Sequence, residues 1–306
     1  MLQNTTQGDL IMLIDIIVPH YKEDNKTLLT ALSSIDNQVG YNSLIQITVV
    51  TDCGGIEPDK ELISNTIKTH VNYFTTDKHL GPGYARQYAI NRTAGDYIMF
   101  CDSDDMLASP FVLKFFEDTL STNPDLEVIM TGYLEEIKTE EGFVYAQRDD
   151  DVSITTLHGK MYSRRFLYDN HIDFPNYMIS EDGAFNFKCV CHAKKAHFND
   201  DVATYIWKYN PNSITRQNTS FPDADVNIRV FGESIVGFEA FFDEIINNKT
   251  SQVNTKIIKP FIESLFIRLN MIKQIPNLND ANQKDIANTE AMLNECLNKY
   301  KEYFNE

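Results

Sequence analysis

Short apolar runs alternate with amphipathic stretches through the first third of the chain. The runs are rich in β-branched and aromatic residues, and each predicts a buried strand: 14–19, 44–50, 71–75 and 97–101. The stretches between them carry apolar residues at helical spacing: 25–38, 61–68 and 84–93. Repeated alternation of strand and helix predicts an α/β fold of the Rossmann-like kind, with a mostly parallel central sheet and flanking helices on both faces.

The pattern changes twice further along the chain. Residues 106–221 mix both periods and predict helices over 111–120 and 180–191 and strands over 126–134, 142–146 and 204–209. Beyond residue 222 apolar residues recur only at helical spacing, which predicts a C-terminal helical appendage of about three helices. The apolar faces of these helices pack most simply against the rest of the chain. Homo-oligomerisation through them, a membrane surface and a partner protein stay open.

Composition narrows the range of partners and compartments. The net charge is −17, so general binding of nucleic acids, which depends on clustered Lys and Arg, is not expected. The five cysteines form no CxxC pair, as is typical of free thiols in a reducing compartment. No signal peptide opens the chain, and no segment reaches the ~20 apolar residues that span a bilayer. We expect a cytoplasmic protein that touches the inner face of the membrane only peripherally, if at all.

Three carboxylates follow the fourth predicted strand. Asp102, Asp104 and Asp105 lie within four residues of one another. Hard cations such as Mg²⁺ and Mn²⁺ prefer carboxylate oxygens, and a cation here could bridge the diphosphate of a nucleotide. The alternative is a polar turn with a helix N-cap. Three acids at one strand end repel one another unless a cation or strong donors join them, which favours a metal.

A glycine-rich turn opens the third predicted helix. Gly81-Pro82-Gly83 would let backbone N–H groups approach an anion. Arg86 adds a positive charge in the first turn, where it works against the helix dipole. A tight turn shaped by the glycines is the bland alternative.

A pair of acids opens the helix predicted over 180–191. Glu181 and Asp182 suit the positive end of the helix dipole, so a purely structural role is one interpretation. As a general base, Asp182 would take a proton from an acceptor hydroxyl. That oxygen would then be a nucleophile toward the anomeric carbon of a sugar.

These segments, in this order, resemble the family 2 glycosyltransferases. The resemblance covers roughly residues 12–216 and implies a GT-A fold and an inverting, single-displacement reaction. It is carried by the segments Ile14–Asp24 (IDIIVPHYKED), Val49–Asp52 (VVTD), Gly81–Arg86, Gly95–Asp105 (GDYIMFCDSDD), Gly159–Leu167, Ile179–Asp182 and Ser213–Arg216.

On this resemblance a divalent cation, Mn²⁺ or Mg²⁺, stabilises the leaving diphosphate. Asp104 would coordinate the cation, and Asp102 would join its shell or contact the donor ribose. Asp182 would be the catalytic base. No third protein ligand for the metal can be placed from the sequence.

The resemblance also implies a nucleotide-sugar donor, with a UDP-sugar favoured. Asp52 would hydrogen-bond the base, and Arg86 would approach the phosphates or the base. The other residues expected around the nucleotide are Pro19, Tyr21, Glu23, Asp102, Ser103 and Asp104. Thr51 stands where the family often has a second acid, which leaves the identity of the nucleotide open.

The expected function is therefore transfer of a sugar to a hydroxyl of a glycan or another acceptor. Residues 1–105 would form the half that binds the nucleotide sugar, 106–221 the half that binds the acceptor, and 222–306 the helical region. Two alternatives stay open. One is a nucleotide-sugar or carbohydrate-binding module without catalysis. The other is a nucleotidyltransferase, although the glycine-rich loop typical of that class is missing from 19–23.

Two further groups carry open interpretations. Lys160, Arg164 and Arg165 could meet a phosphate-bearing acceptor, although a surface or ion-pair role is commoner for basic residues. Tyr205, Trp207 and Tyr209 share one face of a predicted strand. They could form a platform for a sugar ring, although a place in the core or over the sheet is commoner.

Overall fold

The fold was examined in a computed structural model of the chain. The structure describes residues 12–148, 156–175, 181–211 and 277–301. Between 228 and 275 it describes the single positions and short runs 228, 231–232, 235, 239, 243, 265–267 and 269–275.

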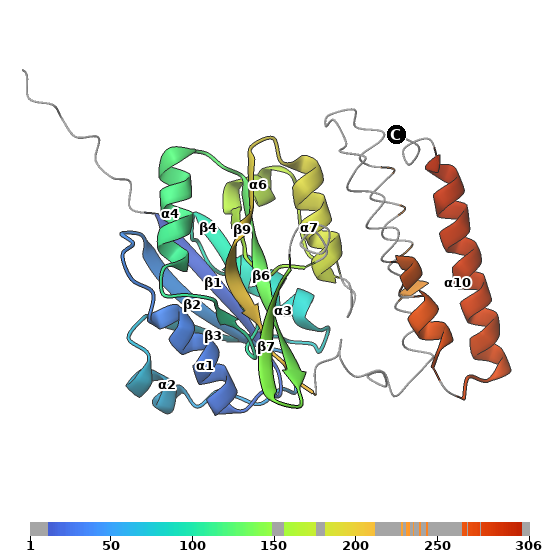
Figure 1. The fold of residues 1–306 in the computed structure, drawn as a ribbon, viewed down its shortest axis with the longest axis horizontal. Coiled ribbons are helices and arrows are strands. Elements are labelled where there is room, and N and C mark those ends of the chain that lie inside the picture. The colour runs from blue at the N-terminus through green and yellow to red at the C-terminus, as the bar shows by residue number, and fades with distance from the viewer. Residues whose placement is uncertain are drawn as a thin grey trace, which may run out of the picture.

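One nine-stranded sheet forms the centre of the molecule (Figure 1). The first four strands are β1 Leu13–His20, β2 Leu44–Thr51, β3 Val71–Thr75 and β4 Tyr97–Phe100. The others are β5 Met106–Leu107, β6 Val128–Thr139, β7 Gly142–Arg148, β8 Lys160–Ser163 and β9 Ala196–Trp207. Their order is β3-β2-β1-β4-β8-β6-β9-β5, and β7 pairs with β6.

Strands β1 to β4 are parallel to one another, as the strand–helix alternation predicts. Beyond β4 the sheet is mixed, because β8 runs antiparallel to both β4 and β6 while β6 and β9 are parallel. The hairpin of β6 and β7 confirms the two strands predicted on either side of an acidic turn. The sequence pattern did not predict β5 and β8, because runs of two and four residues are too short to display a period.

Helices cover both faces of the sheet. They are α1 Asn25–Asp36, α2 Lys60–Thr66, α3 Pro82–Ile90, α4 Val112–Thr122, α6 Arg164–Asp169 and α7 Glu181–His192, while α10 Asp280–Lys299 belongs to the tail and lies away from the sheet. Side chains of α1, α2 and α4 pack in one core cluster with alternate residues of β1, such as Ile14 and Ile16. Side chains of α3, α6 and α7 pack in another with Ile17, which points to the opposite face. The period of two along β1 thus sorts the helices into two layers.

The part of the tail that the structure describes packs against α7. Phe187 and Cys191 of α7 share a buried cluster with Phe231, Leu269 and Leu293 from the tail. This contact favours packing on the rest of the chain over the other interpretations of the tail's apolar faces. Most of the first two predicted tail helices lies outside the described residues, and the third is α10.

Two expectations drawn from composition can be compared with the structure. All five cysteines are free thiols. Among the helices that the structure describes, none combines the length and the apolar character needed to cross a lipid bilayer.

Candidate active site

The carboxyl ends of β1, β2 and β4 meet at one edge of the sheet. His20 pairs with Thr51 in the parallel register of β1 and β2, and the N–H of Asp52 donates to the carbonyl of His20 at 2.8 Å. On the other side of β1, the N–H of Cys101 donates to the carbonyl of Ile17 at 3.0 Å. Parallel strands therefore bring the segment 19–23, Asp52 and the segment 102–105 to the same edge, where ligands bind in sheets of this kind.

Asp52 is buried and ties three loops together. Its Oδ1 accepts from the N–H of Cys53 and the hydroxyl of Thr76, both at 2.9 Å. Its Oδ2 accepts from Nδ1 of His79 at 2.7 Å and from the N–H of Gly81 at 3.0 Å. These four bonds fill the accepting capacity of a carboxylate. Asp52 thus fixes the ends of β2 and β3 and the entrance to α3.

An aromatic pair lies beside this carboxylate. The rings of Tyr21 and His79 are stacked, with centroids 4.6 Å apart and planes 15° from parallel. The His79 side chain is 43% exposed, so a face of the pair is open to a ligand. The sequence did not single out His79, because a lone histidine in a turn carries no motif.

Glu23 turns back toward its own strand end. Its Oε2 accepts from the N–H of Tyr21 at 2.9 Å and lies 3.2 Å from Nδ1 of His20. Burial raises the pKa of Glu23, but the contacts with His20 and Tyr21 outweigh it and lower the pKa to about 2. Glu23 is therefore ionised. Pro19, the residue before His20 in β1, is buried.

The carboxylates that follow β4 are compensated only in part. Asp104 accepts from the side-chain amide of Asn210 at 2.7 Å. Asp105, which is 2% exposed, accepts from the hydroxyl of Tyr205 and the N–H of Lys208, both at 2.8 Å. Burial and the neighbouring Asp102 nevertheless raise the pKa of Asp104, and burial, Asp104 and Asp102 raise that of Asp105 well above its ordinary value. Ser103, between them, is buried.

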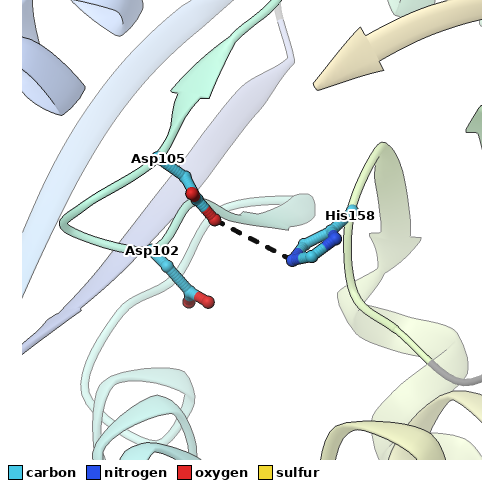
Figure 2. Close-up of side chains that lie close together, drawn as sticks. All are labelled: Asp102, Asp105 and His158. Carbon is cyan, nitrogen blue, oxygen red and sulfur yellow. Dashed lines mark ion pairs between the residues drawn. The ribbon is translucent and has the colours of Figure 1, made fainter. Parts of the chain in front are cut away.

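His158 faces these carboxylates from the loop before β8 (Figure 2). One ligand atom from each of Asp102, Asp105 and His158 lies within 4.8 Å of the others. Nε2 of His158 is 3.9 Å from Oδ2 of Asp105, which is too long for a hydrogen bond. Burial lowers the pKa of His158 to about 3, so its imidazole is neutral. Neutral imidazole and carboxylates are ligands for a divalent cation.

Arg86 joins the two acidic motifs. Its Nη2 donates to Oδ1 of Asp102 at 2.6 Å, and its Nη1 donates to Oε1 of Glu181 at 3.1 Å. The guanidinium is 5% exposed, and its pKa is raised because Asp102 and Glu181 outweigh the effect of burial. The sequence alone did not reveal this consequence of the glycine-rich turn. The helix that it opens places a buried cation between two acids that lie 16 and 95 positions from Arg86 along the chain.

Asp182 follows Glu181 in α7, and its charge interacts with those of Arg86 and Lys160. Burial raises the pKa of Asp182, with Arg86 and Lys160 acting in the opposite direction. Burial and the charge of Asp182 also raise the pKa of Glu181, while the ion pair with Arg86 opposes that shift. Lys160 is 1% exposed, donates to the carbonyl of His158 at 3.1 Å, and has a pKa lowered to about 7 by burial. A buried lysine here corrects the expectation that Lys160 has a surface or ion-pair role.

The other open interpretations are also decided by contacts. Arg164 forms an ion pair with the buried Asp15, and Arg165 is exposed, so both have the commoner structural role. Tyr205 is buried and Trp207 is partly buried against the core, so these two do not offer a free platform for a sugar.

The family of the chain can be stated from its sequence. The model of "Glycosyl transferase family 2" matches residues 15–172, just over half of the 306. The chain belongs to this family. Membership confirms the resemblance and the expectation of a glycosyltransferase domain.

Two curated relatives are named as transferases that act on poly(ribitol-phosphate). A poly(ribitol-phosphate) beta-N-acetylglucosaminyltransferase, TarS of Staphylococcus aureus, is 26% identical over 205 residues, which cover 64% of this chain and 35% of TarS. A poly(ribitol-phosphate) beta-glucosyltransferase of Bacillus spizizenii is 24% identical over 208 residues, which cover 63% of this chain and 32% of that protein. The chain thus spans about a third of the length of these relatives.

Solved structures support the fold that the resemblance implies. The crystal structure of S. aureus TarS 1-349 matches with a TM-score of 0.63 at 20% identity, covering 93% of this chain and 81% of that one. The same protein in complex with UDP-GlcNAc matches with a TM-score of 0.57 at 19% identity, covering 93% and 91%. A mannosyltransferase of Pyrobaculum calidifontis in complex with GDP-Man and Mn²⁺ matches with a TM-score of 0.55 at 13% identity, covering 94% and 75%. The family 2 chain has the GT-A fold of these neighbours.

Proposed function

We propose that this family 2 chain transfers a sugar from a UDP-sugar to a hydroxyl of an acceptor, with inversion at the anomeric carbon. The observation that carries the proposal is the double ion pair of Arg86, which holds Asp102 and Glu181 together in one buried site. Donor-binding and base motifs that lie far apart in the sequence must meet for a single displacement. TarS, of which solved complexes contain UDP and UDP-GlcNAc, supports this choice of donor.

The nucleotide would lie across the edge formed by β1, β2 and β4. The open face of the Tyr21–His79 pair suits stacking of a base. Asp52 would act on the base through His79, because its own oxygens already accept four bonds. Arg86 would approach the phosphates, while Pro19, Glu23 and Ser103 shape the loops on either side.

The residues after β4 fit a divalent cation, Mn²⁺ or Mg²⁺. Burial and the charges of neighbouring acids raise the pKa values of Asp104 and Asp105, so a cation would relieve the repulsion. Asp102 and Asp104 would hold it. When bound, the cation would neutralise charge on the departing nucleoside diphosphate.

Asp182 would be the base. A carboxylate whose pKa is raised by burial is better suited to accept a proton near neutral pH than an exposed one. It would take the proton from the acceptor hydroxyl as that oxygen attacks the anomeric carbon, and the bond from the sugar to the diphosphate would break on the opposite side. In this account residues 1–105 bind the donor and 106–221 the acceptor, with 222–306 as a helical support.

A transfer assay with a panel of nucleotide sugars and Mn²⁺ tests the proposal. Poly(ribitol-phosphate) is the first acceptor to include, because two relatives carry it in their names. We expect release of UDP from one donor by the wild type. Asp182→Asn should lower the transfer rate by about 10²–10⁴-fold while it still binds UDP. Normal turnover by Asp182→Asn would remove the base assignment. Metal-dependent binding of nucleotides without transfer or hydrolysis across the panel would instead identify a binding module.

A further inference from the structure

Three side chains from two separate segments surround one point at the sheet edge. Asp102 and Asp105 follow β4, and His158 precedes β8. Strands β4 and β8 are antiparallel neighbours, so the loop that enters β8 lies beside the end of β4. This pairing brings His158 close to the carboxylates, although it lies 53 positions after Asp105 in the sequence (Figure 2).

We propose that His158 is a nitrogen ligand of the divalent cation, together with Asp102 and Asp105, and that it makes the site prefer Mn²⁺ to Mg²⁺. The inference rests on the proposed function, since it concerns the same cation. It goes further because it adds Asp105 and His158 to the ligands of the cation and assigns a metal preference. Mg²⁺ favours all-oxygen shells, whereas imidazole increases affinity for transition metals.

The His158 ring is held in place by aromatic neighbours. It stacks on Tyr205 with centroids 4.5 Å apart and planes 10° from parallel, and it contacts Tyr133 edge-on at 4.9 Å. The hydroxyl of Tyr205 also donates to Asp105 and accepts from the N–H of Asp102 at 3.0 Å. One tyrosine therefore positions all three candidate ligands, as the supporting residues of metal sites do.

Among the described residues, no hydrogen bond occupies the imidazole nitrogens of His158. Its Nδ1 is buried and has no hydrogen-bond partner there. Its Nε2 is too far from Asp105 for a hydrogen bond, yet the two face each other. A cation between them would give the imidazole and the carboxylate a shared partner.

Pulsed electron paramagnetic resonance of bound Mn²⁺ tests this directly, with Mn²⁺ alone and with Mn²⁺ plus UDP. Coupling of the electron spin to ¹⁴N reports an imidazole ligand, and labelling of histidine with ¹⁵N in the wild type checks it without a substitution. The assigning variant is His158→Gln. The matched control is His70→Gln, at an exposed position next to β3 where the imidazole hydrogen-bonds the side chain of Asn72. Titration with Mn²⁺ and Mg²⁺ gives the affinities.

We expect nitrogen coupling in the wild type and in His70→Gln, and its loss in His158→Gln. The affinity for Mn²⁺ should fall by at least about tenfold in His158→Gln, with a smaller change for Mg²⁺. Bound Mn²⁺ without nitrogen coupling in the wild type, or coupling that survives in His158→Gln, would overturn the inference and leave the proposed function intact. No binding of Mn²⁺ with or without UDP would overturn the proposed cation itself, and the inference with it.

Discussion

Acidic residues at two strand ends of the same sheet edge differ in how far the chain satisfies their carboxylates with hydrogen bonds. At the end of β2, Asp52 accepts four hydrogen bonds from the chain. At the end of β4, Asp104 and Asp105 accept three between them and have raised pKa values. Asp52 therefore stabilises the loops at the sheet edge, whereas Asp104 and Asp105 lack enough positive charge nearby to offset their own.

The difference separates residues that stabilise the fold from residues that await a ligand. Removing a buried acceptor whose hydrogen bonds are all made leaves its donors without partners, which destabilises a protein. Removing one of several acids that repel one another has no such cost. Among the described residues, the cation that pairs with the acids after β4 is Arg86, which Asp102 shares with Glu181.

Arg86→Met should have the largest effect, because it removes that cation from both acidic motifs. Breaking a buried ion pair from one side costs about 3–5 kcal/mol in free energy of unfolding, since the remaining charges are buried and unpaired. Chemical denaturation measures the loss. Arg165→Met, at an exposed arginine, is the control and should change little. A stability of Arg86→Met equal to that of the wild type would mean that the pair does not hold the two motifs together.

Asp104→Ala should act on catalysis rather than on folding. We expect the transfer rate to fall by about 10²–10³-fold, as when one electrostatic contact to the transition state is lost. In the absence of metal the free energy of unfolding should stay within about 0.5 kcal/mol of the wild type. Asp118→Ala on α4, where the acid is exposed, is the matched control for both measurements.

Asp52→Asn should show the reverse balance. The amide cannot accept all four bonds, so at least one buried donor is left unpaired, and the free energy of unfolding should fall by about 1–3 kcal/mol. Chemical denaturation of Asp52→Asn and Asp104→Ala, both without metal, compares their free energies of unfolding and tests this difference directly. If Asp104→Ala is the more destabilised of the two, the distinction between the ends of β2 and β4 is wrong.

The smallest effect expected is on the pH dependence of transfer. Asp182 must be ionised to act as a base, and burial raises its pKa, so the rate should fall as pH drops through that raised value. Lys160 opposes the shift, so Lys160→Met should raise the pKa of Asp182 further and move the acid limb of the pH–rate profile to higher pH. Lys195→Met, at an exposed lysine, should leave the profile unchanged. An acid limb that moves to lower pH in Lys160→Met would contradict the assignment.

Much of the fold was accessible from the sequence. The segments that became β1 to β4 are recognisable as short apolar runs, and the helices between them have apolar residues at helical spacing. The motifs stand in the order that the family resemblance implies. Short elements such as β8 carry no period, so the antiparallel pairing of β8 with β4 could not be foreseen. His158 enters the site only through that pairing.

The site was accessible only as a set of separate motifs. Asp52, Arg86, Asp102 and Asp182 were each singled out, yet no pattern in the sequence reports a contact between residues 86 and 181. The burial of Lys160 is a property of the packed sheet, and its sequence neighbours gave no sign of it. Contacts between distant segments, rather than residue types, were therefore what the sequence alone left undetermined.

The most direct measurement is a crystal structure of the chain soaked with MnCl₂ and UDP, with anomalous diffraction to locate the manganese. The account predicts manganese next to the carboxylates that follow β4, in contact with the diphosphate, and the uracil against Tyr21 and His79. UDP bound at this edge with no manganese beside Asp102 and its neighbours, or UDP bound elsewhere on the molecule, would contradict it.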